Sequence, residues 1–278
     1  MVYINVLFWY KNTEKGNEGD LLMEITYVGQ NGFIITDNKI KICFDLYLSN
    51  CVLEKTGNGK RNYESPYDVQ DVADVNYYFI SHNHLDHLDI DTISKLAVCA
   101  KDIIYICPVP YREILEGLGI QKENIILAKA YKTYKILDNL HFTAIPEKHE
   151  EYVLINGEHC NLGYVISWGI YNIYFAGDAI ADKKLAEDLK AKGPYNIMFV
   201  PINGHDWKRY NEDLMGNMTY REAVDLCCYA GADYIVPMHY DLFENNTENP
   251  AFFVDYLYRE YFGQKFKMFM PGEKMIVN

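Results

Sequence analysis

Short apolar runs, separated by turn-forming residues, recur along most of the chain. They are rich in β-branched and aromatic residues, a composition typical of strands. Several end in Gly, Asp or Asn, which favour turns. The pattern predicts strands over 21–29, 32–37, 39–45, 75–81, 102–108, 124–128, 140–146, 162–168, 171–178, 195–203 and 233–239.

Apolar residues at spacings of three and four predict helices between the later strands. The helix expected over 219–232 opens with a capping box, Thr219 and Glu222, and the one over 249–263 opens with the cap Asn249. Weaker helical patterns cover 91–100, 111–119 and 182–192. Strands alternating with helices are typical of a layered α/β protein.

Polar residues that can bind metals follow directly after several of these strands. They are the stretch 82–87, His149, Asp178, the stretch 204–206 and His239. Side chains at one edge of a layered sheet structure can converge on one site. We therefore expect them to lie close together.

Composition adds limits to this picture. With 278 residues, 49% of them hydrophobic, the chain can bury a large core, and we expect one domain over 22–278 preceded by an arm or peripheral strand over 1–21. The net charge of -13 argues against nucleic-acid binding but not against a small anionic substrate. Seven scattered cysteines indicate reduced thiols and a cytoplasmic protein. No segment suggests a membrane span.

The stretch "SHNHLDHLD", residues 81–89, concentrates three of the eight histidines in one turn. Imidazole and carboxylate groups bind first-row metals without thiolate. His82, His84 and Asp86 stand at alternate positions, with His87 adjacent. This spacing would direct His82 and His84 to one ion and Asp86 and His87 to another. The turn is therefore predicted to form half of a dinuclear site.

This motif resembles the HxHxDH signature of the metallo-β-lactamase superfamily, and the later elements "AGD" and "PMHYD" follow in that family's order. Within the superfamily, "FDLYLS", "FAGDA", "PINGHD", "GNMTYREAVDL" and "IVPMHYDLF" are most similar to the branch of L-ascorbate-6-phosphate lactonase. The resemblance covers residues 22–278. It implies a four-layer αββα sandwich of two mixed β-sheets flanked by helices.

The resemblance also implies two divalent ions, Zn or Mn, and assigns their ligands. The first ion would be bound by His82, His84 and His149, the second by Asp86, His87 and His239, with Asp178 bridging them. His159 lies on the same segment as His149 and is an alternative to it.

Further residues are expected to support this site. Predicted partners of the ligand N–H groups are Asp45, Asp89 and Asp241. Predicted substrate contacts are Trp207, Lys208, Arg209, Tyr210 and Arg221. Asp86 and His205 are the predicted catalytic residues, and His205 would donate a proton or contact an oxyanion. Relatives often carry arginine at the position of His205.

The resemblance implies a metal-dependent hydrolase in which a hydroxide between two ions attacks the substrate. The expected reaction opens a lactone of a small polar or phosphorylated sugar-type compound. The alternatives are a phosphodiesterase or nuclease, which the acidic charge disfavours, and a protein that binds a metal or metabolite without catalysis. The aromatic N-terminal arm and the last predicted helix would provide a surface for a homo-oligomer.

Overall fold

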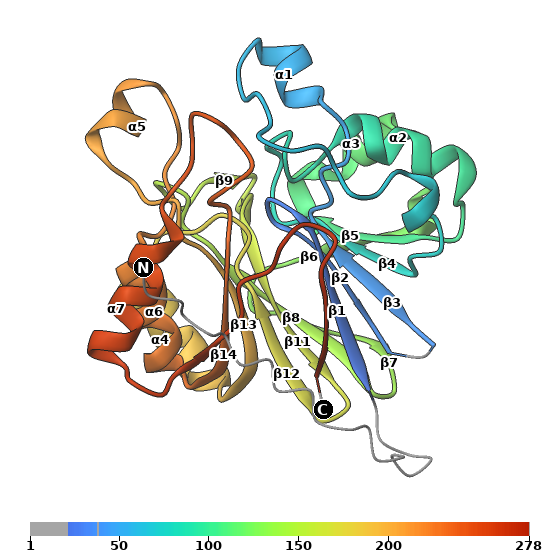
Figure 1. The fold of residues 1–278 in the computed structure, drawn as a ribbon. Helices are drawn as coiled ribbons and strands as arrows, with labels where there is room; N and C mark the ends of the chain where they lie inside the picture. The colour runs from blue at the N-terminus through green and yellow to red at the C-terminus, as the bar shows by residue number, and fades with distance from the viewer. Residues whose placement is uncertain (1–21, 38, 278) are drawn as a thin grey trace.

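Two seven-stranded sheets make up the centre of the part of the chain that the computed structural model describes, residues 22–37 and 39–277. Figure 1 shows them side by side, with helices outside each. The predicted N-terminal arm, residues 1–21, lies outside the described residues.

The first sheet has the strand order β16-β1-β2-β3-β4-β5-β6. Its strands are β1 (Met23–Gly29), β2 (Gly32–Thr36), β3 (Lys41–Phe44), β4 (Tyr77–Phe79), β5 (Ile104–Pro108), β6 (Ile125–Ala128) and β16 (Lys274–Val277). Pairing is antiparallel from β16 to β3 and parallel from β3 to β6, so the sheet is mixed.

The second sheet has the order β15-β14-β13-β12-β11-β8-β7. Its strands are β7 (Thr133–Leu137), β8 (Leu140–Pro146), β11 (Leu162–Trp168), β12 (Tyr171–Phe175), β13 (Tyr195–Pro201), β14 (Ala232–Met238) and β15 (Lys265–Phe266). It is parallel from β15 to β12 and antiparallel from β12 to β7. A small hairpin, β9 (Leu154–Ile155) and β10 (Glu158–His159), stands apart.

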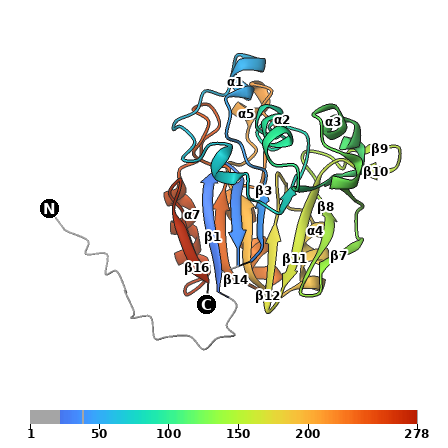
Figure 2. The same cartoon turned by 90° about the vertical axis from the view of Figure 1, so that its right-hand side faces the viewer.

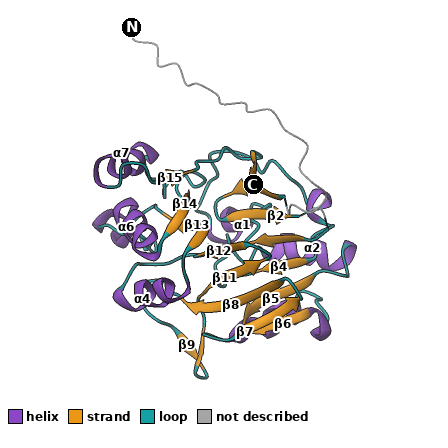
Figure 3. Ribbon diagram, turned by 90° about the horizontal axis from the view of Figure 1, so that it is seen from below, coloured by secondary structure: helices purple, strands orange, loops and turns teal. Residues whose placement is uncertain are grey.

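Helices cover the outer face of each sheet. The α-helices are α1 (Cys51–Thr56), α2 (Ile90–Cys99), α3 (Arg112–Gly117), α4 (Lys183–Lys192), α5 (Trp207–Asn211), α6 (Tyr220–Ala230) and α7 (Pro250–Glu260). Short 3-10 helices span Gln70–Val72, Val109–Tyr111 and Lys122–Asn124. Figure 3 shows α4, α6 and α7 in a row beside the second sheet, while α2 and α3 pack on the first. The predicted four-layer sandwich is confirmed.

Aromatic side chains fill the space between the sheets. Phe44 of the first sheet stacks on Phe175 of the second, with ring centroids 4.5 Å apart. Phe33 and Phe199 meet across the same interface, also at 4.5 Å. All four are fully buried, so this layer contributes much of the apolar area that stabilises the fold.

Every strand and helix predicted from the sequence corresponds to an element of the structure. The strands β7, β9, β10, β15 and β16 and the helices α1 and α5 were missed. Of these, β9, β10 and β15 have two residues each, and β7 alternates exposed Thr and Lys with half-buried positions. Such segments carry too weak an apolar pattern to stand out.

No helix among the described residues is long and apolar enough to cross a bilayer. The association through the last helix stays a prediction. On that side of the molecule Tyr258 and Phe262 are exposed.

Candidate metal centre

The turn after β4 places the histidine-rich stretch at one end of the sandwich. The backbone N–H groups of His87 and Leu88 both donate to the carbonyl of His84, at 3.0 and 2.8 Å, which closes the turn tightly. Asp89 then caps α2 by accepting from the backbone of Thr92. The strands β8, β12 and β14 end at the same place and deliver His149, Asp178 and His239.

One group of potential ligands comprises His82, His84, His149 and Asp178, whose donor atoms lie within 4.8 Å of one another. The Oδ2 atom of Asp178 is 4.0 Å from His82 Nε2 and 3.6 Å from His149 Nε2. His159, the alternative ligand, lies in β10 against Tyr152 and belongs to no such group. The geometry therefore favours His149.

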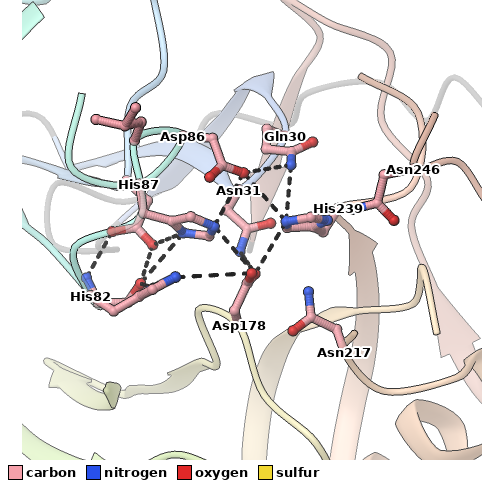
Figure 4. Close-up of polar contacts among 12 residues, drawn as sticks. Gln30, Asn31, His82, Asp86, His87, Asp178, Asn217, His239 and Asn246 are labelled. Carbon is pink, nitrogen blue, oxygen red and sulfur yellow. Dashed lines mark hydrogen bonds and ion pairs between the residues drawn. The ribbon is translucent and has the colours of Figure 1, made fainter. Parts of the chain in front are cut away.

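A second group comprises Asp86, His87 and His239. The other carboxylate oxygen of Asp178, Oδ1, is 3.3 Å from the Nε2 atoms of both His87 and His239. The Oδ2 atom of Asp86 is 3.5 Å from the same two nitrogens. Figure 4 shows Asp178 between the histidines. Its two oxygens thus face different groups, the arrangement that a bridging ligand needs.

Two buried imidazole nitrogens within the described residues support a metal at this cluster. The Nε2 atoms of His82 and His149 have no hydrogen-bond partner. Buried polar atoms are rarely left without a partner, because an unmade hydrogen bond costs about 1–3 kcal/mol. Imidazole and carboxylate donors suit Zn and Mn, so the residues present fit such an ion.

The opposite ring nitrogens are held by outer partners, as is usual for metal-binding histidines. Asp45 Oδ2 lies 2.7 Å from His87 Nδ1. The Ser81 hydroxyl donates to the same oxygen at 2.5 Å and lies 2.9 Å from His82 Nδ1. The Gly216 carbonyl lies 3.1 Å from His149 Nδ1. These contacts direct the Nε2 atoms toward Asp178.

Asp45→Ala is expected to weaken metal binding about ten- to a hundredfold, since it removes the group that orients His87. The measurement is a competition titration with a chelator of known affinity. Asp138→Ala, at a side chain that is 99% exposed, is the control. Equal affinities in the two variants would contradict the role assigned to Asp45.

The sequence did not indicate Gln30 and Asn31, in the turn between β1 and β2. Gln30 Nε2 donates to Asp86 Oδ2 at 2.8 Å and lies 2.9 Å from His239 Nε2, while Asn31 Nδ2 donates to Asp178 Oδ1 at 3.2 Å. Both residues are buried. Their place in a polar turn, distant in sequence from the histidines, left no signal that could have identified them.

Backbone strain gathers at the same end of the fold. Gln30, Asp45 and His239 have φ values of 55°, 40° and 59°, in the left-handed region that residues other than glycine uncommonly adopt. Gly177, before Asp178, has a φ of 63°, and a Cβ there would lie 2.5 Å from the Ser81 Cβ. Only glycine fits this position beside the ligands.

Two predicted partners of the ligands, Asp89 and Asp241, hold other hydrogen bonds, and their support of the ligand N–H groups stays a prediction. The carboxylate of Asp89 accepts hydrogen bonds from Ser49 and Thr92 and contacts no ligand histidine, because it serves as the cap of α2. Asp241 accepts from the hydroxyls of Tyr63 at 2.9 Å and Tyr27 at 3.3 Å.

The Lys and Arg side chains predicted to bind an anionic substrate either bond to other protein groups or lie outside the two cavities described below. The guanidinium of Arg209 is buried and donates to Asp206, to Asn246 Oδ1 and to the Thr247 carbonyl. Arg221 lies over the rings of Tyr220 and Tyr256 on α6 and α7. Lys208 is exposed and lines neither of the cavities described below. The use of Lys208, Arg209 and Arg221 as substrate contacts stays a prediction.

Two cavities, each of about 470 Å³, adjoin at this end of the fold. The first, which we call the metal cavity, is lined by His84, Asp86, His149, Asp178 and His239, and on its far side by Val52 and Thr56 of α1. The second, which we call the side cavity, is lined by His205, Trp207 and Tyr210 together with Ile180. Leu214 lines both. Figures 1 and 2 show α1 and α5 projecting at this same end of the sheets.

His205 faces the side cavity rather than the metal ligands. Its Nδ1 is 2.8 Å from the Asn217 carbonyl and 3.7 Å from Glu222 Oε2, and 42% of the side chain is exposed. Its role as a proton donor stays a prediction.

Burial and charge divide the histidines into two classes. Burial lowers the pKa of His82, His84 and His149, the last to about 4. Burial also opposes the charged form of His239, but Asp178 and Asp86 outweigh it and raise the pKa to about 9. The same two carboxylates raise the pKa of His87 against its burial. At neutral pH the histidines of the first group are therefore neutral, and those of the second hold protons that a metal must displace.

Metal affinity at the second group is expected to rise with pH below about 9, by about tenfold per pH unit for each proton displaced. The first group, where His149 is neutral above about pH 4, should show little dependence between pH 6 and 8. Calorimetric titration with Mn²⁺ in buffers of different ionisation enthalpy measures both the affinity and the protons released. Proton release that is the same for both binding events would contradict this difference.

The comparisons with known proteins agree with this geometry. The family model described as beta-lactamase superfamily domain matches residues 46–240. A UPF0173 metal-dependent hydrolase of Pyrococcus furiosus is 24% identical over 265 residues, which cover 91% of this chain and 99% of the relative. A second one, from Carboxydothermus hydrogenoformans, is 24% identical and covers 92% and 100%.

Solved structures show the same fold. Igni18, a metallo hydrolase of Ignicoccus hospitalis, superimposes with a TM-score of 0.70 at 18% identity, covering 92% of this chain and 99% of that one. An isothiocyanate hydrolase from Delia radicum gut bacteria gives a TM-score of 0.72 at 19% identity, covering 91% and 98%. The family match spans most of the chain and includes the turn after β4, Asp178 and His239. The chain belongs to the metallo-β-lactamase superfamily, as the HxHxDH motif predicts.

Proposed function

We propose that this protein is a hydrolase that uses two divalent ions to open a lactone or a similar ester. One observation carries the proposal: the two oxygens of Asp178 face two separate groups of imidazoles, and in the first group the buried Nε2 atoms of His82 and His149 have no hydrogen-bond partner. The relatives named as metal-dependent hydrolases match over nearly their whole length, which supports the same reading for this chain.

Two ions bound at such a cluster activate water near neutral pH and polarise the bond that water attacks. The residues of this chain provide the conditions for that chemistry. Burial raises the pKa values of Asp86 and Asp178, but the neighbouring histidines outweigh it and lower them, so that both carboxylates stay ionised. Ser81 and Asp45 fix the orientation of the rings of His82 and His87. The two carboxylates are therefore ionised, and the rings of His82 and His87 are oriented, before a substrate binds.

A lactone is favoured by the resemblance to the ascorbate-phosphate lactonase branch. The phosphorylated form of that substrate has little support here, because Arg209 is engaged and Arg221 lies outside both cavities. We therefore propose an uncharged carbonyl substrate rather than a phosphorylated one. Zn and Mn both fit the mixed nitrogen and oxygen donors.

The experiment is elemental analysis of protein purified without added metal, followed by turnover of a panel of lactones and phosphodiesters with Zn²⁺ or Mn²⁺. About two equivalents of metal together with lactone opening are expected. Phosphodiester cleavage without lactone opening would favour the phosphodiesterase reading. Tight metal binding with no turnover on either class would favour a protein that binds without catalysis, and no metal after reconstitution would overturn the proposal.

A further inference from the structure

The segment from His205 to Gly216 forms a wall between the metal cavity and the side cavity. It contains α5, whose cap Asp206 accepts from the backbone of Arg209. Arg209 ties α5 to the 246–247 turn through Asn246 and Thr247, and the Gly216 carbonyl contacts the ligand His149. The wall is thus fixed to the metal centre at its end and to the body of the fold in its middle.

The face of this wall in the side cavity is largely apolar. Trp207 and Tyr210 are 75% and 71% exposed, with ring centroids 5.9 Å apart, and they line the cavity together with Ile180 and Leu214. Contiguous exposed apolar patches rimmed by polar residues are typical of ligand-binding grooves, and aromatic rings contribute a large apolar area to them. Leu214 also lines the metal cavity, so the apolar surface continues to the edge of the ligand cluster.

The charges around the two cavities disfavour an anionic ligand. Glu150 and Asp206 line the side cavity, and Glu212 and Asp213 line the metal cavity. Among the described lining residues Arg209 is the one Lys or Arg, and its guanidinium is already bonded to three protein groups. In the side cavity, apart from the ions proposed for the metal cavity, a carboxylate or phosphate would meet Glu150 and Asp206 without a free Lys or Arg to offset them.

We propose that the side cavity receives an uncharged apolar group of the substrate while the reacting carbonyl lies in the metal cavity. Leu214, Trp207 and Tyr210 then determine specificity for carbonyl compounds that carry an alkyl or aryl substituent. This inference rests on the proposed function, because it places the rest of the substrate relative to the same metal centre.

The test compares two uncharged lactones, δ-valerolactone, which has no side chain, and δ-decalactone, which carries a pentyl chain. A third lactone has a chain that ends in a carboxylate. With metal-loaded protein, kcat/KM should increase by roughly three- to fourfold for each methylene group that enters the side cavity. The carboxylate at the chain end should remove this gain.

Binding is followed separately through the fluorescence of Trp207, with Trp207→Phe to assign the signal. In Asp178→Asn protein, which is expected to bind the lactone without opening it, the same fluorescence change reports binding alone. Tyr210→Ala should reduce the ratio of kcat/KM between the two uncharged lactones. Tyr229→Ala, at another exposed tyrosine outside both cavities, is the matched control.

The outcomes distinguish this inference from the proposed function. Binding of δ-decalactone at Trp207 without turnover would support the apolar cavity and count against the hydrolase. Equal kcat/KM values for the two uncharged lactones, or a higher value for the lactone with a carboxylate, would contradict the apolar side cavity but not the proposed hydrolase activity. Neither binding nor turnover with any of the three would overturn both.

Discussion

Asp178→Asn is expected to remove most of the bound metal and to lower the hydrolytic rate by more than about a hundredfold. The reason is the position of this carboxylate, whose two oxygens face His82 and His149 on one side and His87 and His239 on the other. Loss of an outer partner of a ligand typically costs ten- to a hundredfold, and loss of a group shared by both positions should cost more. Elemental analysis and lactone turnover measure the two effects.

Asn keeps the shape of Asp178, so the variant changes charge with little change in packing. Asp138→Asn, which alters a side chain that is 99% exposed, controls for the lost charge. Full metal content in Asp178→Asn protein would show that this carboxylate does not bridge the two groups.

Phe175→Ala is expected to lower the free energy of unfolding by about 3–5 kcal/mol, the second large effect. Phe175 is fully buried and stacks on Phe44 at 4.5 Å, across the interface between the sheets. Truncation would leave a cavity where both sheets meet, because the surrounding strands cannot close it without breaking their pairing. Denaturation by urea, followed by circular dichroism, measures the change.

Ile170→Ala provides the control, since this side chain is 80% exposed in the turn before β12. Its effect should stay within about 0.5 kcal/mol. Similar losses in the two variants would show that the packing of Phe175 against Phe44 is not what stabilises the sandwich.

The sequence predicted the fold well because its short apolar runs are rich in β-branched and aromatic residues and are bounded by clear turns. All eleven predicted strands exist, and α6 begins with the predicted capping box of Thr219 and Glu222 and ends at Gly231. The last predicted helix ends at Glu260, before the predicted stop at Gly263. Boundaries of this kind depend on tertiary contacts that a local pattern does not contain.

The metal cluster was predictable for a different reason, the concentration of ligand-type residues at strand ends. The structure brings together all seven predicted ligands and places Asp45 against His87. The contacts of Gln30 and Asn31 were not predictable, because an amide in a turn is far more often a solvated group than a partner of a ligand. The hydrogen bonds of Asp89 at a helix cap and of Arg209 to a loop were not predictable either, because a charged residue near a motif can serve several roles.

Because the charges of the second group of ligands balance one another, the protein is expected to fold before it binds metal. Two carboxylates, Asp86 and Asp178, face two imidazoles, His87 and His239, whose pKa values they raise, so that the four charges largely balance before a cation binds. Many small zinc domains fold only on metal, because their core is too small to stand alone. Here the core is large, and protonated histidines act as the counter-ions of the buried acids. A chelator should therefore remove the ions while the chain stays folded. The bound cation would then depend on which metal is available to the folded protein, not on which metal is present during folding.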